Sequence, residues 1–300
     1  MTQLRLLIKR NTKLFFKDKG MFFTALITPM ILLMLYATFL GNIYEDSITS
    51  MLAAVGAVSD ERVLGGFVGG QLTSSILAVS CVTVAICANM LMVTDKASGA
   101  RRDLVISPVS PTILSLSYYF STLIVTFIIC LSALAVCFIY LAFVGWYLTF
   151  GDVALLLLDV FIMVMFGTAL SSVISFFLST QGQISAVGTI VSSGYGFICG
   201  AYMPISQFSD WLRNLVGVLP GTYGTSLLRR HALRGAIAEW ENAGIPDEII
   251  TSIRDSVDYS IYVFDTEMPL WAAYTILCGA VVLLIGVYVL MNIVKSKKNK

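Results

Sequence analysis

Residues Ile113–Val144 read ILSLSYYFSTLIVTFIICLSALAVCFIYLAFV, a run that contains no charged side chain. A helix needs about 20 apolar residues to cross ~30 Å of hydrocarbon, so this run is long enough to span a membrane. The rest of the 300-residue chain has the same character, with 57% hydrophobic residues, 12% charged residues and a mean hydropathy of +0.86. Soluble domains carry about 25% charged residues. These values exclude a soluble globular protein and a disordered chain.

Five further apolar runs have the length of a membrane span, and we expect helices because an open chain in lipid must satisfy its own backbone hydrogen bonds. The sequence therefore predicts an all-α integral membrane protein with six transmembrane helices. In chain order the predicted spans are Met21–Ile43, Gly66–Val93, Ile113–Val144, Val153–Leu178, Ile184–Met203 and Pro269–Val294.

The basic residues predict the orientation of these spans. With six spans, both termini share one side with the loops at 94–112 and 179–183. That side collects 13 of the 19 basic residues and all nine lysines. Cytoplasmic loops carry an excess of Lys and Arg, so we expect both termini to be cytoplasmic and the protein to lie in a cell membrane.

The residues before the first span form an amphipathic pattern. Cations face away from the apolar residues on a helical wheel, as expected for a helix lying in the membrane interface with its charges toward anionic headgroups. We divide the chain into this interfacial elbow helix, residues 1–20, and a transmembrane domain, residues 21–300. A plain charge cluster that only fixes topology is the alternative. The apolar face holds Leu4, Leu7, Ile8, Leu14 and Phe15, and the opposite face holds Arg5, Lys9, Lys13 and Lys17.

Hydrolytic chemistry has little support in the sequence. The only histidine, His231, falls in a predicted external segment, and no HExxH, GxSxG or Cys/His cluster is present, so we expect no catalytic residues and no metal site. The clearest charge inside a span is Asp159. Because an intramembrane carboxylate is costly, Asp159 either faces a transport pathway and contacts cationic substrate or reaches the nearby outer surface.

The sequence also lacks a nucleotide site. Gly65–Leu72 reads GGFVGGQL, which has the glycine spacing of a phosphate-binding loop. Gln71 and Leu72 stand where such a loop needs lysine and a hydroxyl. These glycines instead favour a bend or a close approach between helices, and any ATP that drives this protein must bind a separate subunit.

Two segments resemble ABC-2 type ABC transporter permeases. The first, TDKASGARRDLVISPVSPTIL (Thr94–Leu114), is similar to the cytoplasmic loop of that family, and the second is FICGAYMPISQFSDWLRNLVGVLPGTYGTSLLR (Phe197–Arg229). The matching positions in the first are Asp95, Gly99, Ala100, Leu104, Ser107, Pro108, Val109 and Ser110. Those in the second are Gly200, Pro204, Ile205, Trp211, Leu212, Leu219, Pro220, Thr222, Tyr223 and Arg229.

The resemblance implies a permease subunit that forms a homodimer or heterodimer and binds two ATPase subunits, which hold ATP and Mg. In this family the loop at 94–112 is the coupling helix that seats in the ATPase. A solvated loop that only fixes topology is the alternative. The residues expected to couple to the ATPase are Asp95, Gly99, Arg101, Arg102, Leu104, Val105 and Ile106.

Two further sets of residues complete the predicted site. Small residues four apart form a stripe for close helix contact, either at the dimer interface and pathway or within one protomer. The external helical segment 204–268 includes an amphipathic re-entrant or interfacial hairpin that suits an external gate, followed by an acidic helical cap. The stripe is Gly188, Ser192, Gly196 and Gly200, and the gate residues are Pro204, Trp211, Pro220 and Tyr223.

The favoured function is therefore an ATP-driven exporter that moves an amphipathic or hydrophobic molecule, such as a drug, an antimicrobial peptide or a toxin, out of the cell. The alternatives are a lipid or lipid-linked glycan exporter and a membrane sensor that recruits an ATPase without transport. The partners are ATPase subunits, a second permease and membrane lipid. A net charge of +1 gives no support for nucleic acid.

Overall fold

The computed structural model describes residues 2–54, 56, 60–107, 109–263 and 266–298. The elements in chain order are α1 (Thr2–Lys17), α2 (Lys19–Leu35), a π-helical turn η1 (Tyr36–Leu40), α3 (Gly41–Ala53), α4 (Glu61–Ala97), α5 (Ala100–Ile106), α6 (Pro111–Val144), α7 (Phe150–Phe177), α8 (Gln181–Ile198), a 3₁₀ turn η2 (Ile205–Gln207), α9 (Asp210–Gly217), α10 (Pro220–Asn242), α11 (Asp247–Ser256), β1 (Tyr262–Val263), β2 (Thr266–Glu267) and α12 (Leu270–Lys298). The all-α prediction is confirmed, since the only described strands form one short antiparallel pair.

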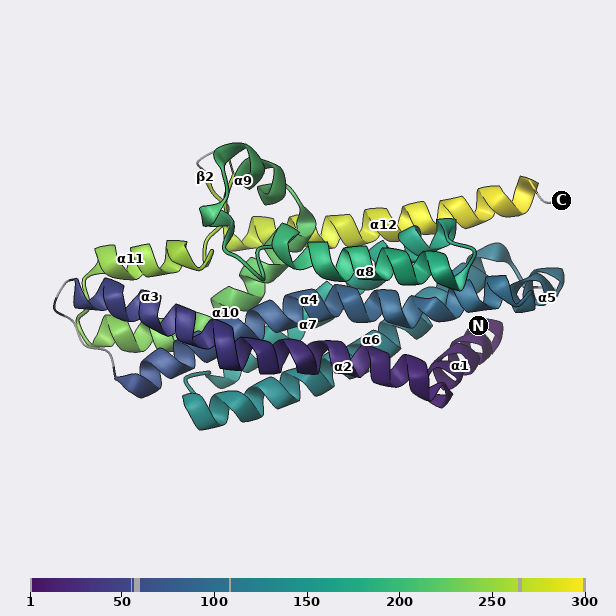
Figure 1. The fold of residues 1–300 in the computed structure, drawn as a ribbon. Coiled ribbons are helices and arrows are strands. Elements are labelled where there is room, and N and C mark those ends of the chain that lie inside the picture. Colours follow the sequence, from purple (N-terminus) through teal and green to yellow (C-terminus); the bar gives the residue numbers. More distant parts are fainter. Residues whose placement is uncertain (1, 55, 57–59, 108, 264–265, 299–300) are drawn as a thin grey trace.

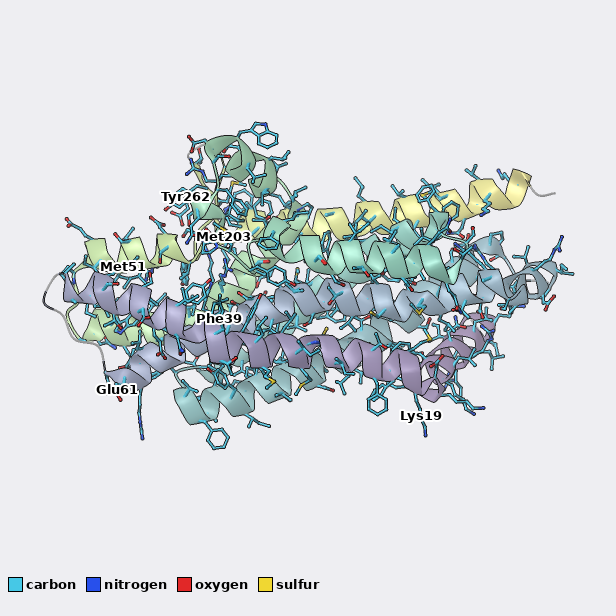
Figure 2. The ribbon with its side chains drawn as sticks, viewed as in Figure 1. Lys19, Phe39, Met51, Glu61, Met203 and Tyr262 are labelled. Carbon is cyan, nitrogen blue, oxygen red and sulfur yellow. The ribbon has the colours of Figure 1, made fainter. Side chains whose placement is uncertain are left out.

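The long helices run side by side in an elongated bundle (Figure 1). Both chain termini lie at one end together with α1 and α5, and α3 and α11 lie at the other end. We call the first the basic end, because most of the lysines lie in or beside the elements that meet there. Lys19 and Glu61, labelled in Figure 2, mark opposite ends of the bundle.

Five helical stretches among the described residues are long and apolar enough to cross a membrane: Lys19–Ala53, Glu61–Ala97, Pro111–Val144, Phe150–Phe177 and Leu270–Lys295. Each corresponds to one of the predicted spans, of which two extend one residue beyond the helix, at Leu178 and Pro269. The remaining prediction, Ile184–Met203, corresponds to α8, which has 18 residues. Glutamines, serines and glycines make α8 less apolar than the other five, and the helix ends before Gly200, whose φ is +72°.

Predicted helix ends differ from the structure where polar residues continue a helix. The first span was expected to end at Ile43, but α2, η1 and α3 follow one another without a break to Ala53. Tyr36, which is buried, begins the π turn, and its carbonyl oxygen accepts a hydrogen bond from the Gly41 amide five residues later. Pro29 lies inside α2. Hydrophobicity marks the part of a helix that lies in lipid and not its full length.

Several helix starts follow directly from local sequence. Ser110 accepts a hydrogen bond from the Ile113 amide ahead of Pro111, which suits the first position of α6 because its missing N–H is not needed there. Thr149 and Asp152 form a reciprocal capping box at the start of α7. These caps set the residues at which α6 and α7 begin.

Helix α4 is the centre of the bundle and contacts α2, α6, α7, α8 and α10. Its glycine-rich start permits these contacts, as predicted for GGFVGGQL. A Cβ atom on Gly70 would come within 2.7 Å of the Ala232 carbonyl oxygen of α10. The backbones of α4 and α10 therefore approach more closely at Gly70 than any other residue would allow.

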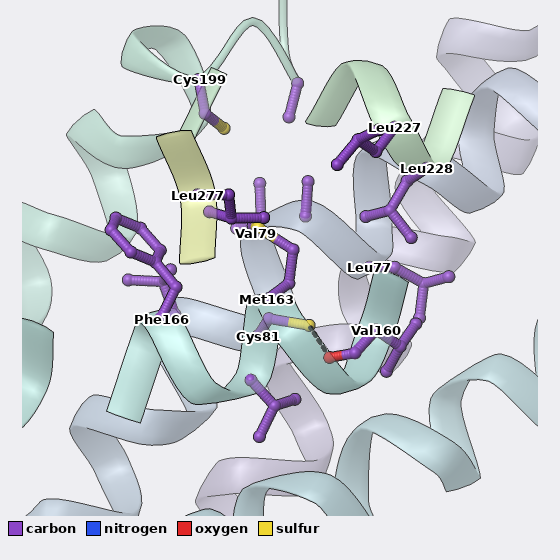
Figure 3. Close-up of a cluster of buried hydrophobic side chains, with 14 of the residues drawn as sticks. Leu77, Val79, Cys81, Val160, Met163, Phe166, Cys199, Leu227, Leu228 and Leu277 are labelled. Atoms are coloured by element: carbon purple, nitrogen blue, oxygen red, sulfur yellow. Dashed lines mark hydrogen bonds between the residues drawn. The ribbon is translucent and has the colours of Figure 1, made fainter. Parts of the chain in front are cut away.

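The main hydrophobic core lies where α4, α7, α10 and α12 converge, and Figure 3 shows part of it. Leu77, Met163, Leu228 and Leu277 come from these four helices and are fully buried. The thiol of Cys81 contacts the Val160 carbonyl oxygen at 4.0 Å. The described cysteines are all free; four of them, Cys81, Cys130, Cys137 and Cys199, are buried as small core residues, whereas Cys278 is exposed.

The segment predicted as external, 204–268, is only partly outside the bundle. Its longest helix, α10, packs against α4, α7 and α12 and buries Leu227, Leu228 and Leu233. Helices α9 and α11 and the β1–β2 pair lie on the periphery (Figure 1). His231, which the sequence placed in this external segment, is buried where α10 packs against α7, and the side of the membrane on which it lies stays a prediction.

Candidate functional site

Helix α5 projects from the basic end at the position predicted for the coupling helix. Gly99 precedes it with a φ of +84°, a conformation that other residues adopt only with strain, so the chain turns sharply out of α4. Leu104 packs back against the bundle. Val105 and Ile106 are 53% and 79% exposed. The helix therefore presents two apolar side chains to the surroundings and is held from behind by a third.

A buried carboxylate fixes the helix that leads into α5. Arg10 of α1 donates to Asp95 Oδ2 at 2.8 Å and to Oδ1 at 3.3 Å, and Tyr118 of α6 donates to Oδ2 at 2.7 Å. The hydrogen bond to Asp95 raises the pKa of Arg10, which stays charged. Asp95 thus joins α1, α4 and α6 directly before the turn. The sequence singled out Asp95, but nothing in it pointed to Arg10 or Tyr118.

The elbow helix α1 rests on protein as well as on the predicted membrane interface. Phe15 is buried beside Ala25, Val84 and Val125, and Leu7 packs against the cluster around Tyr118. Leu14, which was placed on the same apolar face, is exposed. A wheel drawn from sequence gives the apolar side of a helix but not which neighbour covers it.

The other predicted coupling residues lie around α5. Arg101 donates to Asn292 Oδ1 of α12 at 2.8 Å, so the first turn of α5 is tied to the last transmembrane helix. Arg102 is exposed. Pro108, a position matched in the resemblance, lies outside the described residues. Contacts with an ATPase, and hence the coupling role of these residues, stay a prediction.

Asp159 lies in a buried hydrogen-bonded group. Its Oδ2 is 2.5 Å from His231 Nδ1, and Tyr274 donates to Oδ1 at 2.6 Å. These three side chains come from α7, α10 and α12. Asp159 is 1% exposed, so in this conformation it neither reaches the outer surface nor lies open to a pathway. Its predicted contact with substrate stays a prediction, and its partners could not be found from sequence, because they are distant in the chain.

The four small residues of the predicted stripe lie on the side of α8 that meets the same chain. A Cβ on Gly188 would lie 3.6 Å from Ile86, and one on Gly196 would overlap the ring of Tyr202. The Tyr202 hydroxyl donates to the Ser192 carbonyl oxygen at 3.1 Å. Gly200 forms the turn after the helix. An adjoining side of α8 is exposed and includes Ser185, Thr189, Ile190, Ser193 and Phe197.

The predicted gate residues divide into two groups. Trp211 is exposed on α9, where Leu215 and Val218 are also exposed, so this short helix turns an apolar face outward. Pro204 is buried at η2, Pro220 begins α10, and Tyr223 is buried in the core. The structure therefore places Trp211 at the surface and the other three where the hairpin joins the bundle.

An ion pair that the sequence did not predict holds this hairpin. Arg229 of α10 pairs with Asp258 at 3.3 Å and also donates to the Gly200 carbonyl oxygen. Asp258 accepts from the Ile205 and Ser206 amides, at 2.5 Å and 3.0 Å. Burial raises the pKa of Asp258, and Arg229 and the two amides oppose that shift. The end of α8, the η2 turn and the loop after α11 are thus joined at one buried point.

Within the described residues no group of three or more His, Cys, Asp or Glu side chains is placed to hold a metal ion.

The long apolar helices define a helical membrane protein with several spans. A short helix, α5, projects from its basic end, and Asp95 and Arg101 hold the base of that helix. A family model described as ABC-2 type transporter matches residues 2–231. Because the match covers more than half of the chain, this protein belongs to the ABC-2 type transporter family and is a membrane component of a transporter. A search of the curated proteins found no match.

Proposed function

We propose that this chain is the permease subunit of an ATP-driven exporter, moved by ATPase subunits that dock on α5 and bind the ATP and Mg. The observation that supports this most is the combination of exposed Val105 and Ile106 with a base fixed by Asp95 and Arg101. The apolar side chains of α5 offer contact area to a docking partner. The contacts of Asp95 and Arg101 would pass a movement of α5 to α1, α6 and α12.

A second permease copy is the proposed neighbour of the exposed face of α8. Ser185, Thr189 and Ser193 lie on that face, and the Thr189 and Ser193 hydroxyls donate to the carbonyl oxygens four residues earlier. Small and polar residues favour helix–helix contact or a solvated path over lipid. We place the dimer contact and the pathway on this face, next to the predicted Gly188–Gly200 stripe and not along it.

The proposed substrate is amphipathic or hydrophobic, exported from a bacterial cell across its cytoplasmic membrane. The transmembrane helices are largely apolar, and the buried Asp159 group offers one polar centre among them. The basic end would face the cytoplasm, because Lys and Arg are retained on that side. Both termini and α5 share this end, as a cytoplasmic ATPase requires (Figure 1).

Docking on α5 is tested by replacing Val105 and Ile106 with aspartate and capturing the tagged permease from detergent-solubilised native membranes. The wild type should retain ATP-hydrolysing activity on the resin, and the double variant should lose at least tenfold of it. Val218→Asp is the matched control, because Val218 is 55% exposed and directly follows α9, which lies far from α5 (Figure 1). Retained ATPase in the α5 variant, with both variants equally well folded, would refute the docking assignment.

A further inference from the structure

Three cations gather where α4, α5, α7 and α12 meet at the basic end. Lys96 donates to the carbonyl oxygens of Ser175, Phe176 and Leu178, at 2.6–2.9 Å, and so caps the end of α7. The ammonium groups of Lys96 and Lys295 lie 5.8 Å and 5.1 Å from the centre of the Phe176 ring, so both stand beside the same side chain. Arg101 is held beside them by Asn292, three residues before Lys295 on α12.

No carboxylate of the described residues forms an ion pair with any of these three cations. The adjacent Asp95 is already bound by Arg10 and Tyr118. Like charges held together at the edge of a low-dielectric bundle favour a bound anion.

The surroundings of the cluster indicate what carries that anion. Lys96 and Lys295 stand at the last turn of apolar stretches long enough to span a membrane. Phe177, Leu290 and Val294 lie close by in the chain and are exposed. A free inorganic anion gains nothing from these apolar side chains, whereas the acyl chains of a lipid pack on them. Basic pockets between transmembrane helices are suited to anionic headgroups.

We propose that Arg101 and Lys295 form a binding site for the phosphodiester headgroup of an anionic phospholipid, whose acyl chains lie along the exposed side of α12. Lys96, whose three N–H groups are bound by the end of α7, contributes charge beside this site and not a direct contact. The bound headgroup would draw the first turn of α5 toward α7 and α12. Lipid composition would then set how firmly the base of α5 is held. The inference requires only that the basic end lies at a membrane surface, so it stands or fails independently of docking and of substrate.

The test uses the full-length protein, purified in an uncharged detergent, with its thermal unfolding midpoint followed as lipid is added. Phosphatidylglycerol should raise the midpoint saturably, and phosphatidylcholine and inorganic phosphate should not. A cation near a lipid surface contributes ~1 kcal/mol, so Lys295→Gln should raise the half-saturating phosphatidylglycerol concentration about fivefold. Lys295→Arg, which keeps the charge, should stay within twofold of the wild type.

Lys297→Gln is the matched control, because Lys297 is an exposed cation on α12, two residues beyond Lys295 and on a different side of the helix. It should change the half-saturating concentration less than twofold. Equal losses in Lys297→Gln and Lys295→Gln would show diffuse surface attraction and overturn the site. Stabilisation by inorganic phosphate alone would overturn the lipid assignment, as would equal effects of phosphatidylglycerol and phosphatidylcholine.

Discussion

Replacing Asp95 with asparagine tests whether the helix that leads into α5 is anchored by charge. Asp95 is buried, accepts two hydrogen bonds from Arg10 and accepts a third from Tyr118. Asparagine has nearly the same shape and can still accept from either partner, but it removes the negative charge. The substitution therefore leaves the Arg10 guanidinium half-buried without a counterion.

The size of the effect follows from these contacts. Hydrogen bonds to a charged group contribute about 1.5–3 kcal/mol, and we expect about 2 kcal/mol because the Arg10 side chain is 33% exposed and partly solvated. For chains of 150–250 residues a loss of 1 kcal/mol lowers the melting temperature by about 2–4 °C. The variant should therefore unfold about 4–8 °C below the wild type, as measured by intrinsic tryptophan fluorescence in detergent.

A double-mutant cycle separates the pair from other effects. The double variant Arg10→Gln/Asp95→Asn should lose about 1 kcal/mol less of the free energy of unfolding than the two single variants lose in sum. The effects of substitutions within one hydrogen-bonded network are not additive. Asp103→Asn is the control, because Asp103 is exposed on α5 and should stay within about 0.5 kcal/mol of the wild type. Additive single changes would refute the anchor, even if each variant were unstable.

Three other predictions concern the bundle. Gly70→Val should lower stability by about 1–3 kcal/mol in thermal unfolding, because its side chain would meet the α10 backbone, whereas Gly279→Val, in open space, should not. Asp159→Asn should cost about 1–3 kcal/mol by weakening the contact to its histidine; an unchanged melting temperature would contradict that contact. Lys96→Met should lower the free energy of unfolding by about 1–3 kcal/mol, because carbonyl groups at the end of α7 lose their hydrogen-bond donor. Amide hydrogen exchange at the end of α7 should become faster, and unchanged exchange would count against the cap.

The sequence predicted the parts of the fold that depend on local composition. Apolar runs located the five long helices, and the loop at 94–112 contains α5, because lipid solubility and helix capping are decided within a few turns of chain. α8 was harder to assign, since it is less apolar and largely in contact with protein on one side. The sequence did not predict that α4 and α7 pack against α10. The charged residues of α10 are typical of an exposed helix, and their partners are not visible in the sequence.

The candidate site divides in the same way. Asp95, Val105 and Ile106 were identified from their place in a motif, and Asp159 from the cost of a charge in a span. The partners of the two carboxylates, Arg10 and His231, lie 85 and 72 residues away in the chain. No periodicity in a single sequence specifies such a pair.

The sequence by itself determined that the protein lies in lipid, because its composition is that of a membrane protein. Its lysines mark one end of the bundle, and its glycines permit close contacts between helices. Only the tertiary structure determined which carboxylate pairs with which basic side chain. Buried carboxylates and cations are stable only when opposite or polar groups surround them, and those groups come from helices brought together by packing around α4.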